Sequence, residues 1–389
     1  MKIAVLGSGM VGRTMAIDLA NQHDVTSFDA SDYALKMLQS KSSSIKTVKA
    51  DLTVYKTYSD LLKPFDLVIT AVPGFMGFET LKAVINAGKN VVDISFFPED
   101  ALELDALAKE KNVTAITDCG VAPGVSNLVI GRYNEIMEIE SFECYVGGLP
   151  KIRKKPFEYK APFSPIDVIE EYTRPARLKE NGQIVVKPAL SEIELMDFDE
   201  VGTLEAFNTD GLRSILFTMP HISNLKEKTL RYPGHAELII ALQRSGFFST
   251  ESIRFKENEI APLQYTSAIL LKEWKLAPDE EEFTVMKVIV KGKMKKGGEK
   301  PLSFGERFGE RLKTIEYSML DRFDVAAQTS SMSRTTGYTC TAAANAFAEG
   351  LFNEKGVFPP ELVGKNEKCF DYVLNYLKKR NVNWVKKEY

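Results

Sequence analysis

Apolar and polar residues alternate in blocks along the first third of the chain. Short apolar runs predict strands, and the stretches between them carry hydrophobic positions at helical spacing. The predicted strands cover residues 2–6, 24–28, 45–49, 66–71, 90–95 and 113–117. Strands that alternate with helices over short loops form a parallel sheet covered on both faces. Residues 1–122 therefore predict an α/β Rossmann domain, a doubly wound parallel sheet.

The pattern changes after Pro123 and Gly124. Apolar runs such as 141–146, 183–186 and 282–290 are separated by long polar connections, and the lysine-rich residues 293–300 predict an exposed hairpin tip or loop. This arrangement is typical of an α+β domain with a mostly antiparallel sheet. We expect residues 123–334 to form that domain, which would bind substrate and mediate dimerisation.

The last part of the chain has two features that suggest a tail returning to the N-terminal domain. Residues 331–351 are rich in Ala, Thr and Gly, which suits a helix packed very close to another backbone. Residues 366–379 form an amphipathic segment. We expect the C-terminal helices within residues 335–389 to return to the N-terminal domain and complete it.

Composition and charge exclude several classes of protein. The chain has 389 residues, of which 44% are hydrophobic, with 50 basic and 53 acidic side chains and no basic stripe for nucleic acid. No apolar run approaches the roughly 20 residues of a membrane span. The first predicted strand starts at residue 2, so we expect no signal peptide and a cytoplasmic location. The four cysteines are Cys119, Cys144, Cys340 and Cys369, and they lie far apart in the sequence. This spacing favours reduced thiols over disulfides or a metal site.

A glycine-rich turn follows the first predicted strand and opens the first predicted helix. Its sequence is Gly7-Ser8-Gly9-Met10-Val11-Gly12, the G-x-G-x-x-G pattern of dinucleotide-binding sites. Gly7 would allow the tight turn, Gly9 would let the backbone approach a pyrophosphate, and Gly12 would let the helix sit close to the strand. The free N–H groups at the helix start would then face the anion. A glycine-rich turn without a ligand is the alternative.

Asp29 suggests which dinucleotide binds. It ends the second predicted strand, where a carboxylate would accept hydrogen bonds from the adenosine ribose hydroxyls and repel a 2′-phosphate. NAD is therefore favoured over NADP. Asp29 could instead cap the next helix, although Ser31 could do so equally well. Other candidates for contact with the cofactor follow the carboxyl ends of later strands: Asp51, Ala71, Val72, Pro73 and Ser95. Asp51 is equally well explained as a turn residue.

Three clusters could carry chemistry near the nicotinamide. Asp118 follows the sixth predicted strand, although a domain-linking turn would explain its glycine-rich surroundings equally well. Gly147 and Gly148 end a predicted strand and would permit close approach of a ligand, or a tight bend. Arg213 and Arg231 are of the type that binds carboxylates bidentately. Next to Arg231 lies His235, one of three histidines, which could equally be a packed or capping residue.

Several motifs together resemble the saccharopine dehydrogenase-like family over nearly the whole chain, and within it the chain is most similar to the L-lysine 6-dehydrogenases. These motifs are the glycine-rich turn, Asp93-Ile94-Ser95, Ala122-Pro123-Gly124, Gly147-Gly148-Leu149-Pro150, Glu170-Glu171-Tyr172-Thr173-Arg174-Pro175-Ala176 and Thr229-Leu230-Arg231-Tyr232-Pro233-Gly234-His235. The resemblance implies NAD-dependent oxidation of the ε-amine of L-lysine to allysine, which cyclises to Δ1-piperideine-6-carboxylate. It also implies a homodimer or larger homo-oligomer.

That reaction suggests roles for the candidate residues. Hydride can leave the carbon only when the amine is neutral, and a free lysine amine has a pKa near ~10.4, so a proton acceptor or a desolvating pocket is needed. We predict Asp118 as the orienting carboxylate or base, with His235 as the alternative, and Arg213 and Arg231 as holders of the substrate α-carboxylate. Alternative functions are a saccharopine dehydrogenase (reductase), a carboxylated-polyamine dehydrogenase, a non-catalytic NAD(H) sensor, and a structural protein with a vestigial nucleotide site.

Overall fold

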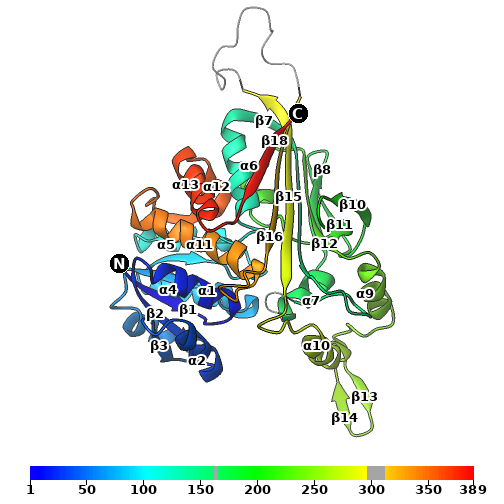
Figure 1. The fold of residues 1–389 in the computed structure, drawn as a ribbon, viewed down its shortest axis with the longest axis horizontal. Helices are drawn as coiled ribbons and strands as arrows, with labels where there is room; N and C mark the ends of the chain where they lie inside the picture. Colours follow the sequence, from blue (N-terminus) through cyan, green and yellow to red (C-terminus); the bar gives the residue numbers. More distant parts are fainter. Residues whose placement is uncertain (162–164, 296–311) are drawn as a thin grey trace, which may run out of the picture.

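Two large β-sheets with helices packed between them, and one small two-stranded sheet, make up the computed structural model, which describes residues 1–161, 165–295 and 312–389 (Figure 1). The N-terminal part of the chain, in blue and cyan, forms one sheet with its helices. The long green and yellow strands form the other, and the orange and red C-terminal helices lie against the first. This arrangement confirms the predicted combination of a Rossmann domain and an α+β domain.

The first sheet has seven strands, and all of its strand pairs are parallel. Its order is β17-β6-β5-β4-β1-β2-β3. The strands are β1 (Lys2–Leu6), β2 (Asp24–Asp29), β3 (Lys46–Lys49), β4 (Leu67–Thr70), β5 (Asn90–Asp93), β6 (Thr114–Ile116) and β17 (Gly356–Phe358). The first six match the six predicted strands. The seventh comes from the C-terminal part of the chain and was not predicted.

Both faces of this sheet are covered, which explains the unbroken apolar runs of its strands. Along β1, Ile3 and Val5 belong to a core cluster with residues of α1 (Met10–Leu19) and α11 (Ser331–Ala348). Ala4 and Leu6 belong to a second cluster, with residues of α4 (Gly74–Asn86). The helices of this part are α1 (Met10–Leu19), α2 (Asp32–Lys41), η1 (Tyr55–Thr57), α3 (Tyr58–Leu61), α4 (Gly74–Asn86), η2 (Ala101–Leu104) and α5 (Asp105–Glu110).

The second sheet is mostly antiparallel, with order β10-β11-β12-β7-β15-β16-β18, while β8 pairs with β12 and β9. The β7–β12 pair is parallel and the other pairs are antiparallel. The strands are β7 (Met137–Pro150), β8 (Ala176–Glu180), β9 (Gln183–Lys187), β10 (Glu194–Phe198), β11 (Gly202–Asn208), β12 (Asn224–Arg231), β15 (Glu282–Met294), β16 (Lys313–Arg322) and β18 (Trp384–Glu388).

One strand of the second sheet is longer than the sequence predicted, and one predicted loop lies only partly within the described residues. The strand predicted over 141–146 continues to Pro150, because β15 pairs with it along its whole length. Gly147 and Gly148 therefore lie inside a strand rather than at its end. Of the predicted lysine-rich tip, residues 296–300 lie outside the described residues.

A group of helices flanks the second sheet at the side away from the C-terminal helices (Figure 1). Three of them, α7, α9 and α10, contribute Tyr172, Ile239 and Leu270 to a core cluster around the buried Trp274. The elements after the first domain are α6 (Val125–Ile136), α7 (Pro165–Thr173), α8 (Ile215–Thr218), α9 (His235–Arg244), α10 (Pro262–Glu273) and the hairpin of β13 (Ile253–Phe255) and β14 (Asn258–Ile260).

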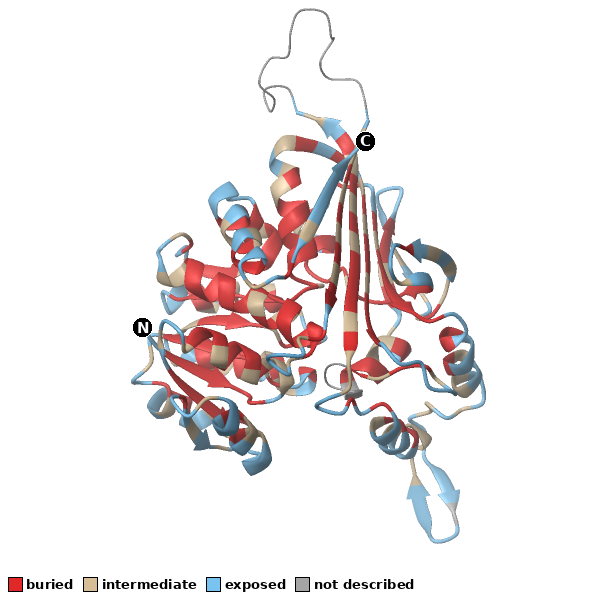
Figure 2. Cartoon of the chain, in the orientation of Figure 1, coloured by how far each residue is buried: buried red, intermediate tan, exposed pale blue. Residues whose placement is uncertain are grey.

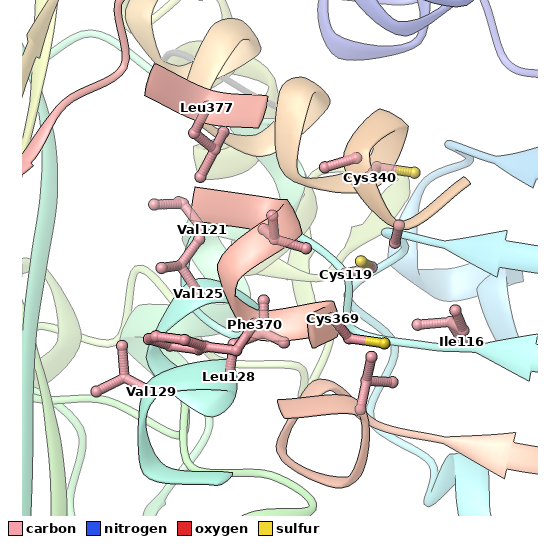
Figure 3. Packing of buried hydrophobic residues seen from close by; sticks show 14 of the residues in the cluster. Ile116, Cys119, Val121, Val125, Leu128, Val129, Cys340, Cys369, Phe370 and Leu377 are labelled. Carbon is pink, nitrogen blue, oxygen red and sulfur yellow. The ribbon is translucent and has the colours of Figure 1, made fainter. Parts of the chain in front are cut away.

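The C-terminal helices pack on the first sheet and on α6. These helices are α11 (Ser331–Ala348), α12 (Pro360–Gly364) and α13 (Glu367–Lys378). The Asp18 carboxylate on α1 accepts hydrogen bonds from Thr341 Oγ1 on α11 at 2.5 Å and from the Tyr376 hydroxyl on α13 at 2.7 Å. Figure 3 shows the apolar contacts of this region, with Phe370 and Leu377 near Val125 and Leu128 of α6. The last strand, β18, pairs instead with β16 of the second sheet.

Burial follows this layered arrangement (Figure 2). The strands of the first sheet and the helices between the two sheets are mostly buried, whereas the β13–β14 hairpin is exposed. Within the residues that the structure describes, no helix is both long enough and apolar enough to cross a membrane.

Candidate functional site

The glycine-rich turn between β1 and α1 has the steric features of a dinucleotide cradle. Gly7 has a φ of +108°, and a Cβ there would lie 2.3 Å from Ala71 O. A Cβ on Gly12 would lie 2.0 Å from Gly7 O, so the turn and the helix require both glycines. At Gly9 a Cβ would meet nothing within 4 Å, and α1 starts after it without a side-chain cap. The backbone therefore leaves open space and free N–H groups where a phosphate could approach.

The Asp29 carboxylate is held at the end of β2 by two backbone groups. The backbone N–H of Ser8 donates to Oδ2 and that of Ser31 donates to Oδ1, each at 2.7 Å. The helix cap is Ser31 itself, whose Oγ accepts from Ala34 N at 3.2 Å. Asp29 is thus positioned toward the glycine-rich turn, and the capping role belongs to Ser31.

Both sheets contribute to one cavity of about 660 Å³, which we call the central cavity. One part, the glycine end, is lined by residues of the first sheet and its loops. The other part, the β12 end, is lined by Gly147, Gly148, Asp167, Glu171, Arg174, Thr209, Asp210, Gly211, Glu227, Thr229 and Arg231. A ligand that fills the cavity would contact both parts of the molecule. This is the position expected for a cofactor at one end and a substrate at the other.

Most of the residues predicted from the sequence line this cavity. They are Gly7, Gly9, Met10, Val11, Gly12, Asp29, Asp51, Ala71, Val72, Pro73, Ser95, Asp118, Gly147, Gly148 and Arg231. Three predicted residues, Ser8, Arg213 and His235, are not in the lining. The Ser8 side chain is buried against Ser27, with 2.8 Å between the two hydroxyl oxygens.

Asp118 follows β6 and forms a buried ion pair with Arg213. Arg213 Nε donates to Asp118 Oδ2 at 2.8 Å, and both side chains are less than a tenth exposed. A second guanidinium nitrogen, Nη1, donates to the backbone oxygen of Phe97. Among the described residues, Asp118 Oδ1 is buried and has no hydrogen-bond partner. The geometry therefore assigns Arg213 to Asp118 and does not support its predicted role as a holder of substrate carboxylate.

His235 lies behind the wall of the central cavity and orients Arg231. Its Nδ1 lies 3.0 Å from Phe157 O and its Nε2 lies 2.9 Å from the Tyr172 hydroxyl. Because Nδ1 must donate to the carbonyl, Nε2 accepts from Tyr172, whose oxygen in turn accepts from Arg231 Nε at 2.9 Å. Burial and the nearby Arg231 lower the pKa of His235 to about 3. This geometry does not support the predicted alternative that His235 takes a proton from substrate.

Four acidic side chains and Arg174 line the β12 end and were not among the site residues predicted from the sequence. The acids are Asp167, Glu171, Asp210 and Glu227. A signal was present for Glu227, because Glu227, Thr229 and Arg231 alternate along β12 and face the same side of the sheet. Glu171 and Arg174 belong to the segment that supported the family resemblance.

Asp93 lies buried beside this site and carries a shifted pKa. The Thr70 hydroxyl donates to its Oδ1 at 2.5 Å. Burial, more than the nearby Asp118, raises the pKa of Asp93 to about 7. Its backbone oxygen accepts from Cys119 N at 2.9 Å, so β5 helps to fix the loop that carries Asp118.

Comparison with protein families covers both parts of the chain. A family model described as the saccharopine dehydrogenase NADP binding domain matches residues 3–116. A second model, described as the saccharopine dehydrogenase C-terminal domain, matches residues 120–382.

Individual relatives are distant in sequence. The chain is 27% identical over 281 residues to the mitochondrial alpha-aminoadipic semialdehyde synthase of Rattus norvegicus, covering 68% of this chain and 30% of that protein. It thus spans about 30% of the length of this relative. A carboxyaminopropylagmatine dehydrogenase of Synechocystis sp. is 22% identical, with 92% of each chain covered.

Among solved structures, the chain is similar to the apo saccharopine dehydrogenase (L-Glu forming) of Saccharomyces cerevisiae. The TM-score is 0.77 at 19% identity, and the match covers 100% of this chain and 99% of that one. At this level of identity the likeness shows the fold alone.

Proposed function

The chain belongs to the saccharopine dehydrogenase family and carries that family's nicotinamide-dinucleotide-binding domain. On that premise we propose that it is an NAD-dependent dehydrogenase that oxidises the ε-amine of L-lysine to allysine. The observation that carries this proposal is that the glycine-rich cradle and an acid-rich β12 end open into one cavity.

NAD is the proposed cofactor because of the charge near Asp29. The Asp29 carboxylate lines the glycine end and would bind ribose hydroxyls while repelling a 2′-phosphate. Asp51 also lines this end, and its Oδ1 accepts from the backbone and hydroxyl of Thr53 at 2.9 and 2.7 Å. Among the described residues, no lysine or arginine lines the cavity beside Asp29 and Asp51 to attract a phosphate.

The charge of the β12 end favours a substrate that carries amino groups. Among its described lining residues, four carboxyl groups accompany only two guanidinium groups, those of Arg174 and Arg231. Both already contact a glutamate: Arg231 Nη2 lies 3.3 Å from Glu171 Oε2, and Arg174 Nη2 lies 2.6 Å from Glu170 Oε2, so we assign the two together to a single substrate carboxylate. Saccharopine carries an additional carboxylate, which would require an additional cationic partner. The lining therefore supports lysine, whose carboxylate Arg174 and Arg231 would bind.

Asp118 is the proposed proton acceptor for the reacting amine. The ion pair with Arg213 fixes Oδ2 and leaves Oδ1 for a ligand group. A substrate ammonium that donates a proton to Oδ1 becomes a neutral amine, whose lone pair allows hydride to leave the neighbouring carbon. When bound, NAD would accept that hydride. The resulting imine would react with water to give the aldehyde and ammonia.

A carboxylated polyamine is the second candidate substrate. The relative from Synechocystis sp. that matches 92% of each chain is named for carboxyaminopropylagmatine. A compound of that class carries several cationic groups with one carboxylate, so it also complements the acid-rich β12 end.

A spectrophotometric substrate panel tests the proposal. L-lysine, saccharopine and carboxylated polyamines would each be incubated with the protein and either NAD or NADP, and reduced cofactor would be followed. We expect turnover with L-lysine and NAD. Activity on saccharopine alone would overturn the substrate. Cofactor-dependent stabilisation without any turnover would point to the sensor alternative, and no stabilisation would point to a vestigial site.

A homodimer or larger homo-oligomer and a cytoplasmic location stay predictions from the resemblance and the sequence. Light scattering coupled to size-exclusion chromatography would measure the assembly.

A further inference from the structure

Three carboxyl groups that line the central cavity have cationic partners within the protein. Asp118 pairs with Arg213 at 2.8 Å and Glu171 with Arg231 at 3.3 Å. Asp210 accepts two side-chain bonds from Arg177, from Nε at 2.9 Å and from Nη2 at 2.8 Å. The charges of these three groups are therefore largely balanced before any ligand enters.

Glu227 differs from these three groups. Its contacts are neutral: the Thr209 hydroxyl donates to Oε2 at 2.7 Å, and that hydroxyl lies 2.8 Å from Thr229 Oγ1. Within residues 1–161, 165–295 and 312–389, no lysine, arginine or histidine forms an ion pair with Glu227. The side chain is only 5% exposed, yet it lines the β12 end of the cavity.

The backbone at Gly211 fixes the position of this carboxyl group. A Cβ on Gly211 would lie 2.4 Å from Glu227 Oε2 and 2.5 Å from its Cδ. The loop after β11 therefore packs directly on the carboxyl group, and glycine is the residue type that leaves room for it. Thr209 and Gly211 together hold Glu227 in one orientation at the cavity wall.

A buried carboxyl group without a cation favours its neutral form. Burial, with smaller contributions from the nearby Glu171 and Asp210 and against the Thr209 and Gly211 hydrogen bonds, raises the pKa of Glu227 to about 8. The groups that face Glu227 are Thr209, Asp210 and Gly211 from the loop, Thr229 from its own strand, Glu171 from α7 and Cys144 from β7. None of these groups supplies a positive charge, so the ionised form of Glu227 requires a cation that a ligand brings.

We propose that Glu227 binds the positively charged α-amino group of the substrate and thereby selects α-amino acids over simple amines. This inference rests on the proposed function in one respect, that the substrate is an amino acid. A bound ammonium group stabilises the ionised carboxylate, so Glu227 loses a proton when the substrate binds near neutral pH. The same contact fixes which amino group of lysine reaches Asp118.

Binding of unreactive ligands tests this role. L-norleucine has the α-amino group and carboxylate of lysine but no ε-amine, and hexanoate lacks both amino groups. Isothermal titration of the NAD-loaded protein would measure both affinities for the wild type, Glu227→Gln, and the control Glu143→Gln. Glu143 lies on β7, binds Lys226 and Lys291, and does not line the cavity.

We expect the wild type and Glu143→Gln to bind norleucine more tightly than hexanoate by about 10- to 100-fold, the range for a charged hydrogen bond. Glu227→Gln should lose that preference while its affinities for hexanoate and NAD stay unchanged. Titration at pH 7 in buffers of different ionisation enthalpy should show proton release with norleucine for the wild type and none for Glu227→Gln.

The proposal is overturned if Glu227→Gln keeps the preference or if the wild type does not bind norleucine. If Glu227→Gln does not fold, Glu227→Asp would be measured instead. Its shorter side chain should weaken the binding of norleucine but not that of hexanoate. These ligands are not oxidised at an ε-amine, so the result is independent of turnover. Loss of the preference in a protein that does not oxidise lysine would reject the proposed substrate and retain the role of Glu227.

Discussion

Asp29 has a charge whose effect can be separated from its hydrogen bonds. An Asp29→Asn variant keeps one oxygen to accept a backbone N–H and removes the negative charge. Because the charge disfavours a 2′-phosphate, we expect the ratio of kcat/KM for NAD to that for NADP to fall by about 10-fold, which corresponds to roughly 1.4 kcal/mol. Steady-state kinetics with both cofactors would measure this ratio.

The control for this prediction is Asp32→Asn. Asp32 is exposed, pairs with Lys49 at 2.6 Å, and does not line the cavity. The ratio should stay at the wild-type value in this variant. An unchanged ratio in Asp29→Asn would show that the carboxylate does not discriminate between the cofactors.

Asp118 should control the protonation state of the reacting amine. Asp118→Asn removes the acceptor, so we expect kcat for lysine to fall by about 10²- to 10⁴-fold near pH 8. Part of the loss should be recovered above pH ~10, where the lysine amine is neutral without help. The pH profile of kcat would measure both effects, with Asp100→Asn, outside the central cavity, as control. Full kcat at pH 8 in Asp118→Asn would reject the role.

At the residue scale, the sequence was most informative where a residue's surroundings are set by nearby parts of the chain. Gly7, Gly12 and Asp29 all lie in the β1–α1–β2 unit, where Asp29 contacts the glycine-rich turn, so their spacing is informative. The partner of Arg213 is Asp118, which lies far away in sequence and meets it only in the fold. The same holds for His235, which packs against Tyr172 of another helix. No local pattern distinguishes a free arginine or histidine from one already bound.

At the scale of elements, the close crossing of α6 and α12 depends on glycine. A Cβ on Gly131 would lie 2.1 Å from Glu361 O. In an isolated helix, glycine to alanine stabilises by roughly 0.5–1 kcal/mol. Here we expect Gly131→Ala to lower the free energy of unfolding by about 1–3 kcal/mol, because the helices must separate. Urea denaturation would measure it, and Glu135→Ala on the exposed face of α6 should change little. Stabilisation by Gly131→Ala would contradict the close contact.

Element boundaries were predictable where burial imposed a strong pattern. Five of the first six strands are mostly buried, so their hydrophobic patterns stand out, whereas the edge strand β3 is mostly exposed. The strand β17 has only three residues, and β18 is mostly exposed, so neither carries enough hydrophobic signal to be recognised. The extension of β7 through two glycines depends on β15 as a partner, which the local sequence does not reveal.

At the scale of the whole molecule, buried acids make stability depend on pH. Glu282 accepts a backbone hydrogen bond from Ser331 at the start of α11, and burial raises its pKa to about 8. The nearby Asp321 also raises this pKa, and Arg334 lowers it. The folded state therefore holds a proton that the unfolded chain, with a carboxyl pKa near ~4.3, releases. By linkage, the contribution to the free energy of unfolding is complete below about pH 4 and is lost as pH rises to about 8.

Glu282→Gln tests this linkage, since glutamine keeps the neutral form at all pH values. We expect the difference in Tm between the variant and the wild type to grow in favour of the variant from pH 7 to pH 8.5. His235 is neutral in the folded protein throughout that window because its pKa is about 3, and its titration in the unfolded chain is the same in the variant and the wild type. Glu281→Gln serves as control, because Glu281 is a partly exposed neighbour that pairs with Lys151. A constant difference across this range would show that Glu282 is ionised in the folded protein.

The edge strand β17 has a consequence for how the protein is made. Its residues Gly356–Phe358 pair with Thr114–Ile116 of β6, yet the ribosome synthesises nearly all of the second sheet between the two. The first sheet of a nascent chain therefore stays one strand short, with the edge of β6 unpaired, until synthesis is almost complete. For the same reason, no single cut in the gene separates the two sheets into independent fragments. A cut between β6 and β7 would leave the N-terminal fragment without β17, which the C-terminal fragment encodes.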